Sequence, residues 1–332
     1  VLWLVFFELM VSWHILRHIR RYHVLVLDVH SVPLVLPFLM ILRLFFRFPI
    51  ASLRIPTNPV ETGALVRSLF LSFLYALSIK LAAVSFDKIF FISPMLGEWY
   101  SVQLGVPKSK TAVWPSPVDT TMFDPRSVTS TDRLRMELAL SDRLGVLYHG
   151  ALTRGRGIME MVQAFSKLRE EHVKASLVLL GDGPLRQEVL RYITSNDLEK
   201  VIQVCGPVGY CDVPEYVAAC DVGIVPLPDH PWWRYQCPTK VLECLAMNKP
   251  LIVTDIPAHR WILGRAPVAL YLKGTSPREI ADGVLAFLAS RNSFDPELGR
   301  RLASEFSGEV LAGMLEHEML SMVEQSLSTR HD

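Results

Sequence analysis

The chain has 332 residues, of which 50% are hydrophobic and 20% charged, a composition that excludes a disordered protein and suffices for two domains with a core each. The net charge of +1 hides an asymmetry, because eleven Lys/Arg against six Asp/Glu give residues 1–120 a net +5 and leave the remainder at −4. A basic, apolar N-terminal half favours an anionic membrane surface or a phosphorylated partner over nucleic acid, with ordinary scatter of surface charge as the alternative.

The apolar runs of the first 120 residues predict alternating strands and helices. Four runs have the length and composition of strands, and a helical stretch at 64–83 lies between the second and the third. The expected strands are 24–28, 49–53, 87–93 and 111–114. We therefore expect a Rossmann-like domain over residues 1–120, followed by a polar linker at 121–142.

The alternation restarts after the linker. Six apolar runs predict strands at 145–148, 175–180, 201–204, 222–226, 250–254 and 268–272. The helical stretches between them lie at 158–169, 184–193, 213–220, 238–247 and 277–289. This short spacing predicts an α/β fold: two Rossmann-like domains, each a parallel sheet with helices on both faces, with a cleft between them. The second domain is expected over residues 143–306, and a helical tail over 307–332.

The first loop of the second domain has the composition of an anion site. Strand 145–148 leads into His-Gly-Ala-Leu-Thr-Arg-Gly-Arg-Gly (149–157) and then into a helix. Its glycines let the backbone approach a ligand closely. Arg154 and Arg156 stand where the helix dipole is already positive, which indicates a bound anion such as a phosphate. A chance basic loop is the alternative.

The segment 238–255 shows the same electrostatic anomaly. It predicts a helix that begins at Pro238, then a tight turn and a buried strand. Lys240 lies in the first helical turn, against the dipole, and Glu243 follows at i+3 on the same face. A cation at an anion site with a carboxylate behind it suits a nucleoside diphosphate and its ribose diol, whereas a solvated surface pair is the alternative. Two such loops indicate one shared polyanion.

Three further motifs occur in order in the second domain: Gly-Asp-Gly-Pro at 181–184 and Gly-Pro-Val at 206–208, each after a strand, and Ala-Cys-Asp-Val at 219–222, which leads into one. Together with the two basic segments, these residues resemble the GT-B-fold glycosyltransferases, in particular the retaining enzymes of glycosyltransferase family 4. The resemblance covers about residues 20–325 and is strongest over 111–260. The Pro-x-Lys-x-x-Glu form at 238–243 is similar to that of polysaccharide-building members.

The resemblance implies transfer of a sugar, with retention, from a nucleoside-diphosphate sugar to a hydroxyl of a glycan or a lipid-linked saccharide. It implies that Glu243 binds the ribose hydroxyls and that Arg156 and Lys240 bind the diphosphate; these three are the expected catalytic residues. Further donor contacts are expected from Gly150, Arg154, Gly157, Gly206, Val208, Pro238 and Thr239. The final helix is expected to brace the first domain. No Asp-x-Asp motif occurs, so neither a metal nor another cofactor is expected.

Several positions depart from the family pattern. The family's second carboxylate, eight residues before Glu243, is Tyr235 here, and the usual arginine after the first loop glycine is Ala151. The family's first glycine-rich loop and its catalytic-side histidine are not found, and the chain begins with Val, so we expect upstream sequence to be missing and the N-terminal domain to be incomplete. His30 and Arg54 are the expected acceptor-side contacts, with a structural role for His30 as the alternative.

These departures leave two other functions open. One is a catalytically degenerate GT-B-fold subunit that binds nucleotide for a partner. The other is a sugar-nucleotide epimerase, which shares the two-domain architecture but is disfavoured by residues 237–255. The base, the sugar and the acceptor are not specified by the sequence.

The cellular location is inferred from hydropathy and cysteine usage. The longest uncharged runs, 31–42 and 68–79, fall short of the roughly 20 residues that a membrane-spanning helix needs. Five cysteines without a Cys-x-x-Cys pair predict reduced thiols in the cytoplasm. The basic, apolar residues 1–50 predict peripheral contact with the cytoplasmic face of a membrane.

Overall fold

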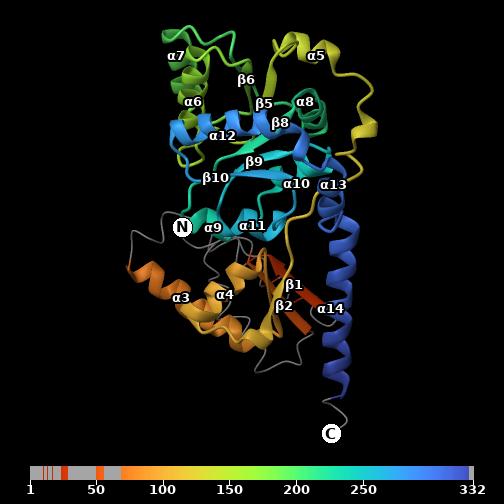
Figure 1. The fold of residues 1–332 in the computed structure, drawn as a ribbon. Helices are drawn as coiled ribbons and strands as arrows, with labels where there is room; N and C mark the ends of the chain where they lie inside the picture. The colour runs from red at the N-terminus through yellow and green to blue at the C-terminus, as the bar shows by residue number, and fades with distance from the viewer. Residues whose placement is uncertain are drawn as a thin grey trace. The chain divides into compact units, whose positions relative to one another are not determined.

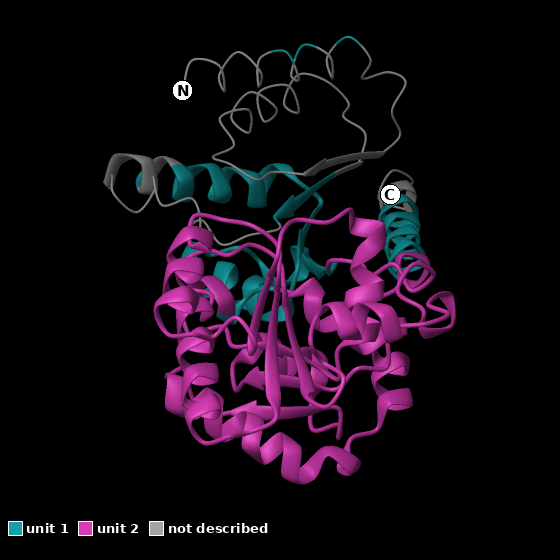
Figure 2. Ribbon diagram, turned by 90° about the horizontal axis from the view of Figure 1, so that it is seen from above, with its two compact units in different colours: residues 1–115, 234–236, 311–332 teal, residues 116–233, 237–310 magenta. Residues whose placement is uncertain are grey.

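The chain divides into two compact units, each with its own parallel sheet. The structure is a computed structural model that describes residues 10, 13, 17, 24–28, 50–55 and 69–328. The first unit comprises residues 1–115, 234–236 and 311–332, and the second comprises residues 116–233 and 237–310 (Figure 2). Both sheets are parallel throughout, so the α/β class expected from the sequence is confirmed.

The first unit is built on a four-stranded sheet in the order β1-β2-β3-β4 (Figure 1). Its strands are β1 (Val24–Asp28), β2 (Ile50–Ile55), β3 (Lys88–Phe91) and β4 (Thr111–Val113). Helix α3 (Leu69–Ser85) precedes β3, and helix α4 (Pro94–Leu104) precedes β4. Strands β2, β3 and β4 are therefore neighbours joined by helical crossovers, which is the arrangement that parallel pairing requires.

The long C-terminal helix α14 (Gly308–Ser328) belongs to the first unit from Leu311 onward. Nζ of Lys88 on β3 lies 2.6 Å from Oε1 of Glu318 on this helix. Ser52 on β2 is fully buried, and its hydroxyl lies 3.9 Å from Sδ of Met322. These contacts fix α14 against the sheet of the first unit.

The second unit is built on a six-stranded sheet in the order β10-β9-β8-β5-β6-β7. Its strands are β5 (Leu144–His149), β6 (Ala175–Leu180), β7 (Ile202–Cys205), β8 (Val222–Val225), β9 (Leu251–Thr254) and β10 (Ala269–Leu272). The chain adds β6 and β7 on one side of β5 and then returns to add β8, β9 and β10 on the other. This reversal beside β5 is the topological switch point, where open parallel sheets bind their ligands.

Helices cover both faces of this sheet (Figure 2). They are α6 (Ile158–Glu170), α7 (Arg186–Ser195), α8 (Val213–Ala219), α10 (Thr239–Ala246), α11 (Pro257–Leu263), α12 (Pro277–Ser290) and α13 (Pro296–Ser304), with the short α5 (Asp132–Glu137) and α9 (Pro231–Arg234). Helices α6 and α12 pack against each other, as do α10 and α13. Every residue of β5 and β6 is buried, because helices cover both faces of the sheet. Such strands have continuous apolar sequences.

Residues 116–142, which include the expected linker, lie in the second unit. Phe123 is fully buried, and the Asp124 carboxylate accepts hydrogen bonds from the Arg126 and Arg300 guanidinium groups at 2.6 and 3.0 Å. These arginines hold the pKa of Asp124 down at about 2. Within the described part of the chain, no helix has both the length and the apolarity to cross a membrane.

Candidate functional site

The candidate site lies at the carboxyl end of β5, beside the start of α10. Strand β5 ends at His149, and α10 carries Lys240 and Glu243, which are only 9% and 5% exposed. Polar side chains that are so deeply buried are expected to be hydrogen-bonded or charge-compensated. The contacts of these two residues therefore define the site.

Both oxygens of the Glu243 carboxylate accept a hydrogen bond. Nε2 of His149 lies 2.6 Å from Oε2, and because an ionised carboxylate only accepts, this nitrogen carries the proton. The hydroxyl of Tyr210 donates to Oε1 at 2.9 Å. Burial alone raises the pKa of Glu243, but the hydrogen bonds from His149 and Tyr210 and the charges of His149 and Lys240 outweigh it, so the pKa lies below its usual value. The carboxylate is ionised at neutral pH.

For Lys240, in contrast to Glu243, the effect of burial on the pKa outweighs that of the neighbouring groups. Its Nζ lies 4.5 Å from the centre of the Tyr148 ring and donates to the Tyr148 hydroxyl at 3.3 Å. Burial lowers the pKa of Lys240 to about 7, with the charge of Arg156 acting in the same direction and Glu243 opposing it. The lysine is thus poised to take up or lose a proton near neutrality, as groups at functional sites often are.

The loop after β5 approaches Lys240 closely because it contains Gly150. This glycine has a φ of +125°, and a Cβ there would lie 3.0 Å from Nζ of Lys240. The Gly-Asp-Gly-Pro turn supports the same loop: a Cβ on Gly181 would lie 2.2 Å from the Gly150 carbonyl oxygen, and the Leu152 amide donates to the Asp182 carbonyl at 2.9 Å. The backbone of the turn therefore packs closely against the loop and supports it.

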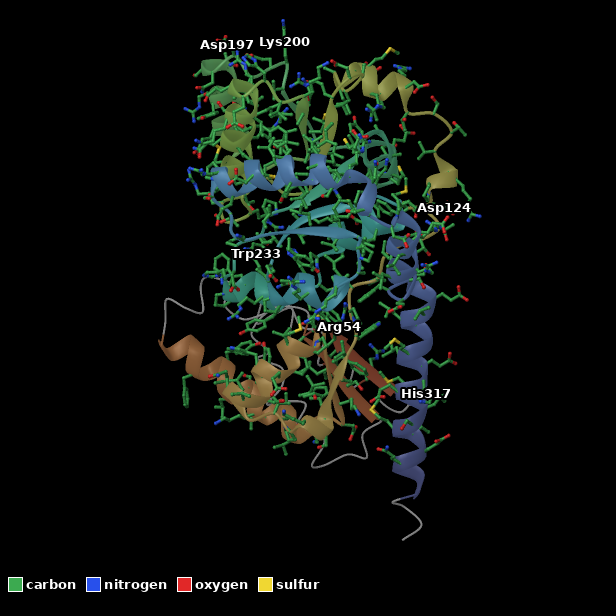
Figure 3. All side chains as sticks on the ribbon, in the orientation of Figure 1. Arg54, Asp124, Asp197, Lys200, Trp233 and His317 are labelled. Carbon is green, nitrogen blue, oxygen red and sulfur yellow. The ribbon has the colours of Figure 1, made fainter. Side chains whose placement is uncertain are left out.

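Arg156 is held at the edge of the site by Trp233. The guanidinium lies 4.5 Å from the centre of the indole ring, and its Nε donates to the Thr153 hydroxyl at 3.1 Å. The indole N–H in turn donates to the Gly155 carbonyl at 2.9 Å. Figure 3 shows Trp233 on α9, where it is 8% exposed. Trp233 therefore fixes the arginine and the loop that carries it.

The other expected donor contacts are not part of this cluster. Arg154 pairs with Glu188 on α7 at 2.7 Å, and its side chain is 80% exposed. Gly157 precedes α6 with a φ of +74°, and a Cβ there would lie 2.7 Å from the carbonyl oxygen of Pro226, so the glycine allows close packing against the residue that follows β8. Pro238 caps α10, and Thr239 is its first residue. Gly206 and Val208 follow β7 and lead to Tyr210.

Of the two expected acceptor-side residues, Arg54 lies in the first unit. The guanidinium of Arg54 on β2 lies 4.6 Å from the centre of the Trp114 ring (Figure 3). His30 lies outside the described residues. Tyr235, at the position of the family's second carboxylate, accepts a hydrogen bond at its carbonyl from the Ser93 hydroxyl at 2.6 Å. Its side chain lines a groove of about 490 Å³ together with Pro94, Met95, Glu98, Trp99, Val102 and Gln103.

Sequence reasoning gave no role to His149, Tyr210 or Tyr148, although all three contact the expected catalytic residues. His149 directly precedes the first loop glycine, and Tyr210 directly follows the Gly-Pro-Val-Gly run, so their places in the motifs were the available signal. Among the residues that the structure describes, no three His, Cys, Asp or Glu side chains gather as a metal site.

Residues 143–290 match the family described as "Glycosyl transferases group 1". Among curated proteins, the chain is similar to alpha-D-kanosaminyltransferase of Streptomyces kanamyceticus, with 25% identity over 171 residues, which are 51% of this chain and 42% of that protein. It is also similar to the putative teichuronic acid biosynthesis glycosyltransferase TuaC of Bacillus subtilis, with 28% identity over 178 residues, 53% and 41% of the two chains. The chain thus matches less than half of the length of these relatives.

Several solved structures resemble this fold. One is a glycosyltransferase from Rickettsia africae, with a TM-score of 0.72 and 14% identity, covering 95% of this chain and 80% of that one. Another is HepE of Anabaena in complex with UDP-glucose, with a TM-score of 0.72 and 15% identity, covering 93% and 82%. At such identities the likeness concerns the fold alone, and it confirms the fold class expected from the sequence. The family resemblance is confirmed as well over residues 143–290, which match the group 1 glycosyltransferases and contain the Lys240–Glu243 cluster.

Proposed function

We propose that the protein is a glycosyltransferase that binds a nucleoside-diphosphate sugar at the Lys240–Glu243 cluster and transfers the sugar to an acceptor hydroxyl. One observation carries the proposal: an ionised, buried carboxylate and a buried lysine of lowered pKa stand one helical turn apart at the switch point of a parallel sheet. The group 1 glycosyltransferase domain supports it, and so do relatives named as glycosyltransferases.

In this proposal each charged side chain has a role in donor binding. The Glu243 oxygens accept hydrogen bonds from the ribose diol. Lys240 and Arg156 meet the diphosphate, and their positive charge stabilises the negative charge that develops on the leaving nucleotide as the bond to the sugar breaks. These side chains can supply that stabilisation without a metal, and we propose that the reaction uses none.

The finer features of the reaction are proposed from the family resemblance. They are transfer with retention and an acceptor that is a glycan or a lipid-linked saccharide. A relative named for teichuronic acid biosynthesis and another named for colanic acid biosynthesis, from Escherichia coli, support a polysaccharide product. We further propose a cytoplasmic protein with peripheral membrane contact through residues 1–50, a region that lies largely outside the described residues.

A degenerate subunit that binds nucleotide without turnover is the second candidate. Tyr235 favours it, because a phenol stands where the family has a carboxylate and lines a groove beside α4. The two candidates share the donor site and differ only in turnover. Donor hydrolysis or transfer by the purified protein distinguishes them.

The donor site is tested with Glu243→Ala and Arg156→Ala. Binding of UDP-, GDP- and ADP-sugars is measured by calorimetry for the wild type and for each variant. The matched controls are Glu137→Ala and Arg133→Ala, which remove an exposed ion pair of 2.8 Å on α5. We expect each site variant to lose at least tenfold in affinity for the preferred donor, about 1.4 kcal/mol, and each control to bind as the wild type does. Equal affinity in all four variants would place the donor elsewhere.

A further inference from the structure

Glu243 is covered in the structure, although the proposed function requires a ligand to reach it. Both of its oxygens are hydrogen-bonded, and the residue is 5% exposed. A ribose diol brings two O–H donors and needs acceptor oxygens in return. One of the two groups on the carboxylate must therefore give up its place when a ribose binds.

The two groups differ in how firmly they are held. His149 is 7% exposed and is the last residue of β5, where it pairs with Leu180 of the neighbouring strand. Tyr210 is 54% exposed and begins a three-residue 3-10 turn, η5 (Tyr210–Asp212). Its ring packs against that of Phe123, with centres 5.6 Å apart and the ring planes tilted by 59°. Because exposed turns open at a much lower free energy than central strands, Tyr210 is the group that can leave.

The hydroxyl of Tyr210 also has the chemistry of a ribose hydroxyl. Burial and the nearby charge of Glu243 raise the pKa of Tyr210, so the phenol keeps its proton at neutral pH and acts as the donor in its bond to Oε1. An uncharged O–H that donates to a carboxylate oxygen is the group that a sugar diol presents.

We propose that the Tyr210 hydroxyl stands in for a ribose hydroxyl on Glu243 in the free protein, so that a ribonucleotide binds by displacing it. This inference rests on the proposed donor site. Under this proposal, Tyr210 affects the affinity for the ribose and does not contribute to binding of the base or the diphosphate. Displacement costs the hydrogen bond between the Tyr210 hydroxyl and the charged carboxylate. The affinity for ribonucleotides is therefore lower than the contacts with the ligand alone would give.

The test is Tyr210→Phe, which removes the hydroxyl and keeps the ring on Phe123. The matched control is Tyr271→Phe, since the Tyr271 hydroxyl donates to the Gly264 carbonyl at 2.9 Å, away from the cluster. Calorimetry measures UDP, GDP and ADP and the 2′,3′-dideoxy form of each. For the nucleotide that binds best, we expect Tyr210→Phe to bind the ribose form about tenfold more tightly, equivalent to 1.4 kcal/mol, and to bind the dideoxy form as the wild type does.

Each other outcome has a definite meaning. Weaker binding of the ribose form by Tyr210→Phe would make the tyrosine a positioning residue for Glu243 and would overturn the proposal. The proposal would also be overturned if the variant bound the ribose form and the dideoxy form with the same affinities as the wild type. If neither protein binds any of the nucleotides, the proposed donor site itself fails.

A second measurement uses the wild-type protein and does not depend on how the variant folds. Amide hydrogen exchange is followed over residues 209–213, where the Asp212 amide donates to the Gly209 carbonyl at 2.9 Å. Displacement of Tyr210 predicts faster exchange in this turn when the ribonucleotide binds, and no change with its dideoxy form. Slower exchange with the ribonucleotide would contradict displacement.

Discussion

The pH dependence of donor binding follows from the environment of Lys240. The groups around its ammonium include the Tyr148 ring and hydroxyl, the Gly150 backbone, the charges of Arg156 and Glu243, and the Cys244 thiol. Burial and the Arg156 charge lower its pKa to about 7 in the free protein. A diphosphate placed against Lys240 and Arg156 reverses this balance, because an adjacent anion favours the charged lysine. Binding near neutrality is therefore coupled to uptake of a proton.

The size of the effect follows from the fraction of lysine that is already charged. With a free-state pKa of about 7, roughly nine-tenths of Lys240 carries its proton at pH 6 and roughly one-tenth at pH 8. If the bound state is fully protonated, the affinity falls about tenfold between these two pH values, which corresponds to 1.4 kcal/mol. The proton uptake per site rises over the same range from about 0.1 to about 0.9.

Calorimetry with a nucleoside-diphosphate sugar measures both quantities. Such a donor is a diphosphate esterified at both ends, which does not titrate near neutrality. Two buffers of different ionisation enthalpy at each pH give the number of protons taken up. Lys240→Arg is the control, because its guanidinium stays charged across this range. We expect its affinity to be independent of pH. A wild-type affinity that is constant from pH 6 to 8 would refute the reasoning, and so would a pH dependence that Lys240→Arg retains.

Three further predictions concern stability. Lys240 binds its proton more tightly in the unfolded chain than in the fold, so its charge destabilises the protein fully below pH 7 and no longer does so above about pH 10.5. We therefore expect Lys240→Met to raise the free energy of unfolding in urea by up to about 4 kcal/mol at pH 7, and we expect this difference to vanish toward pH 10.5. Gly181→Ala is expected to lose about 3 kcal/mol because its Cβ would meet the Gly150 carbonyl, whereas Gly105→Ala, also at positive φ but in open space, is expected to lose about 1; equal losses would contradict the close approach. Trp233→Phe removes the indole N–H and is expected to lower the melting temperature by a few degrees and to weaken donor binding through the arginine that it supports; an unchanged affinity would limit Trp233 to a role in packing.

The strands could be predicted from the sequence because parallel strands are covered on both faces. The runs at 24–28 and 175–180 coincide with β1 and β6, and each of the others differs from the observed strand by one or two residues at one or both ends. Helix α4 was given no bounds from the sequence, and it contains Gly97. A Cβ there would lie 3.2 Å from the Phe91 ring, so tertiary packing selects a residue that helix propensity disfavours.

The charged residues of the site were visible in the sequence because they violate a local rule. A cation at the start of a helix opposes the dipole, and this reasoning identified Lys240 and Arg156 without a fold. It could not separate Arg156 from Arg154, two positions away in the same loop. The structure separates them, because Arg154 pairs with an exposed glutamate on α7 while Arg156 stacks on a buried tryptophan.

The uncharged partners could not be found in this way, since a histidine at a strand end or a tyrosine in a turn breaks no local rule. Their function arises when the fold brings the end of β5, the turn after β7 and helix α10 to one point. There, Glu243 receives enough hydrogen bonds to stay ionised in spite of its burial, and Lys240, which lies one turn away, does not receive enough to stay fully charged. An anion that binds beside Lys240 supplies the missing stabilisation, whereas a neutral ligand does not. We therefore propose that the unequal environments of these two adjacent charges make the cluster selective for anionic ligands such as a sugar nucleotide.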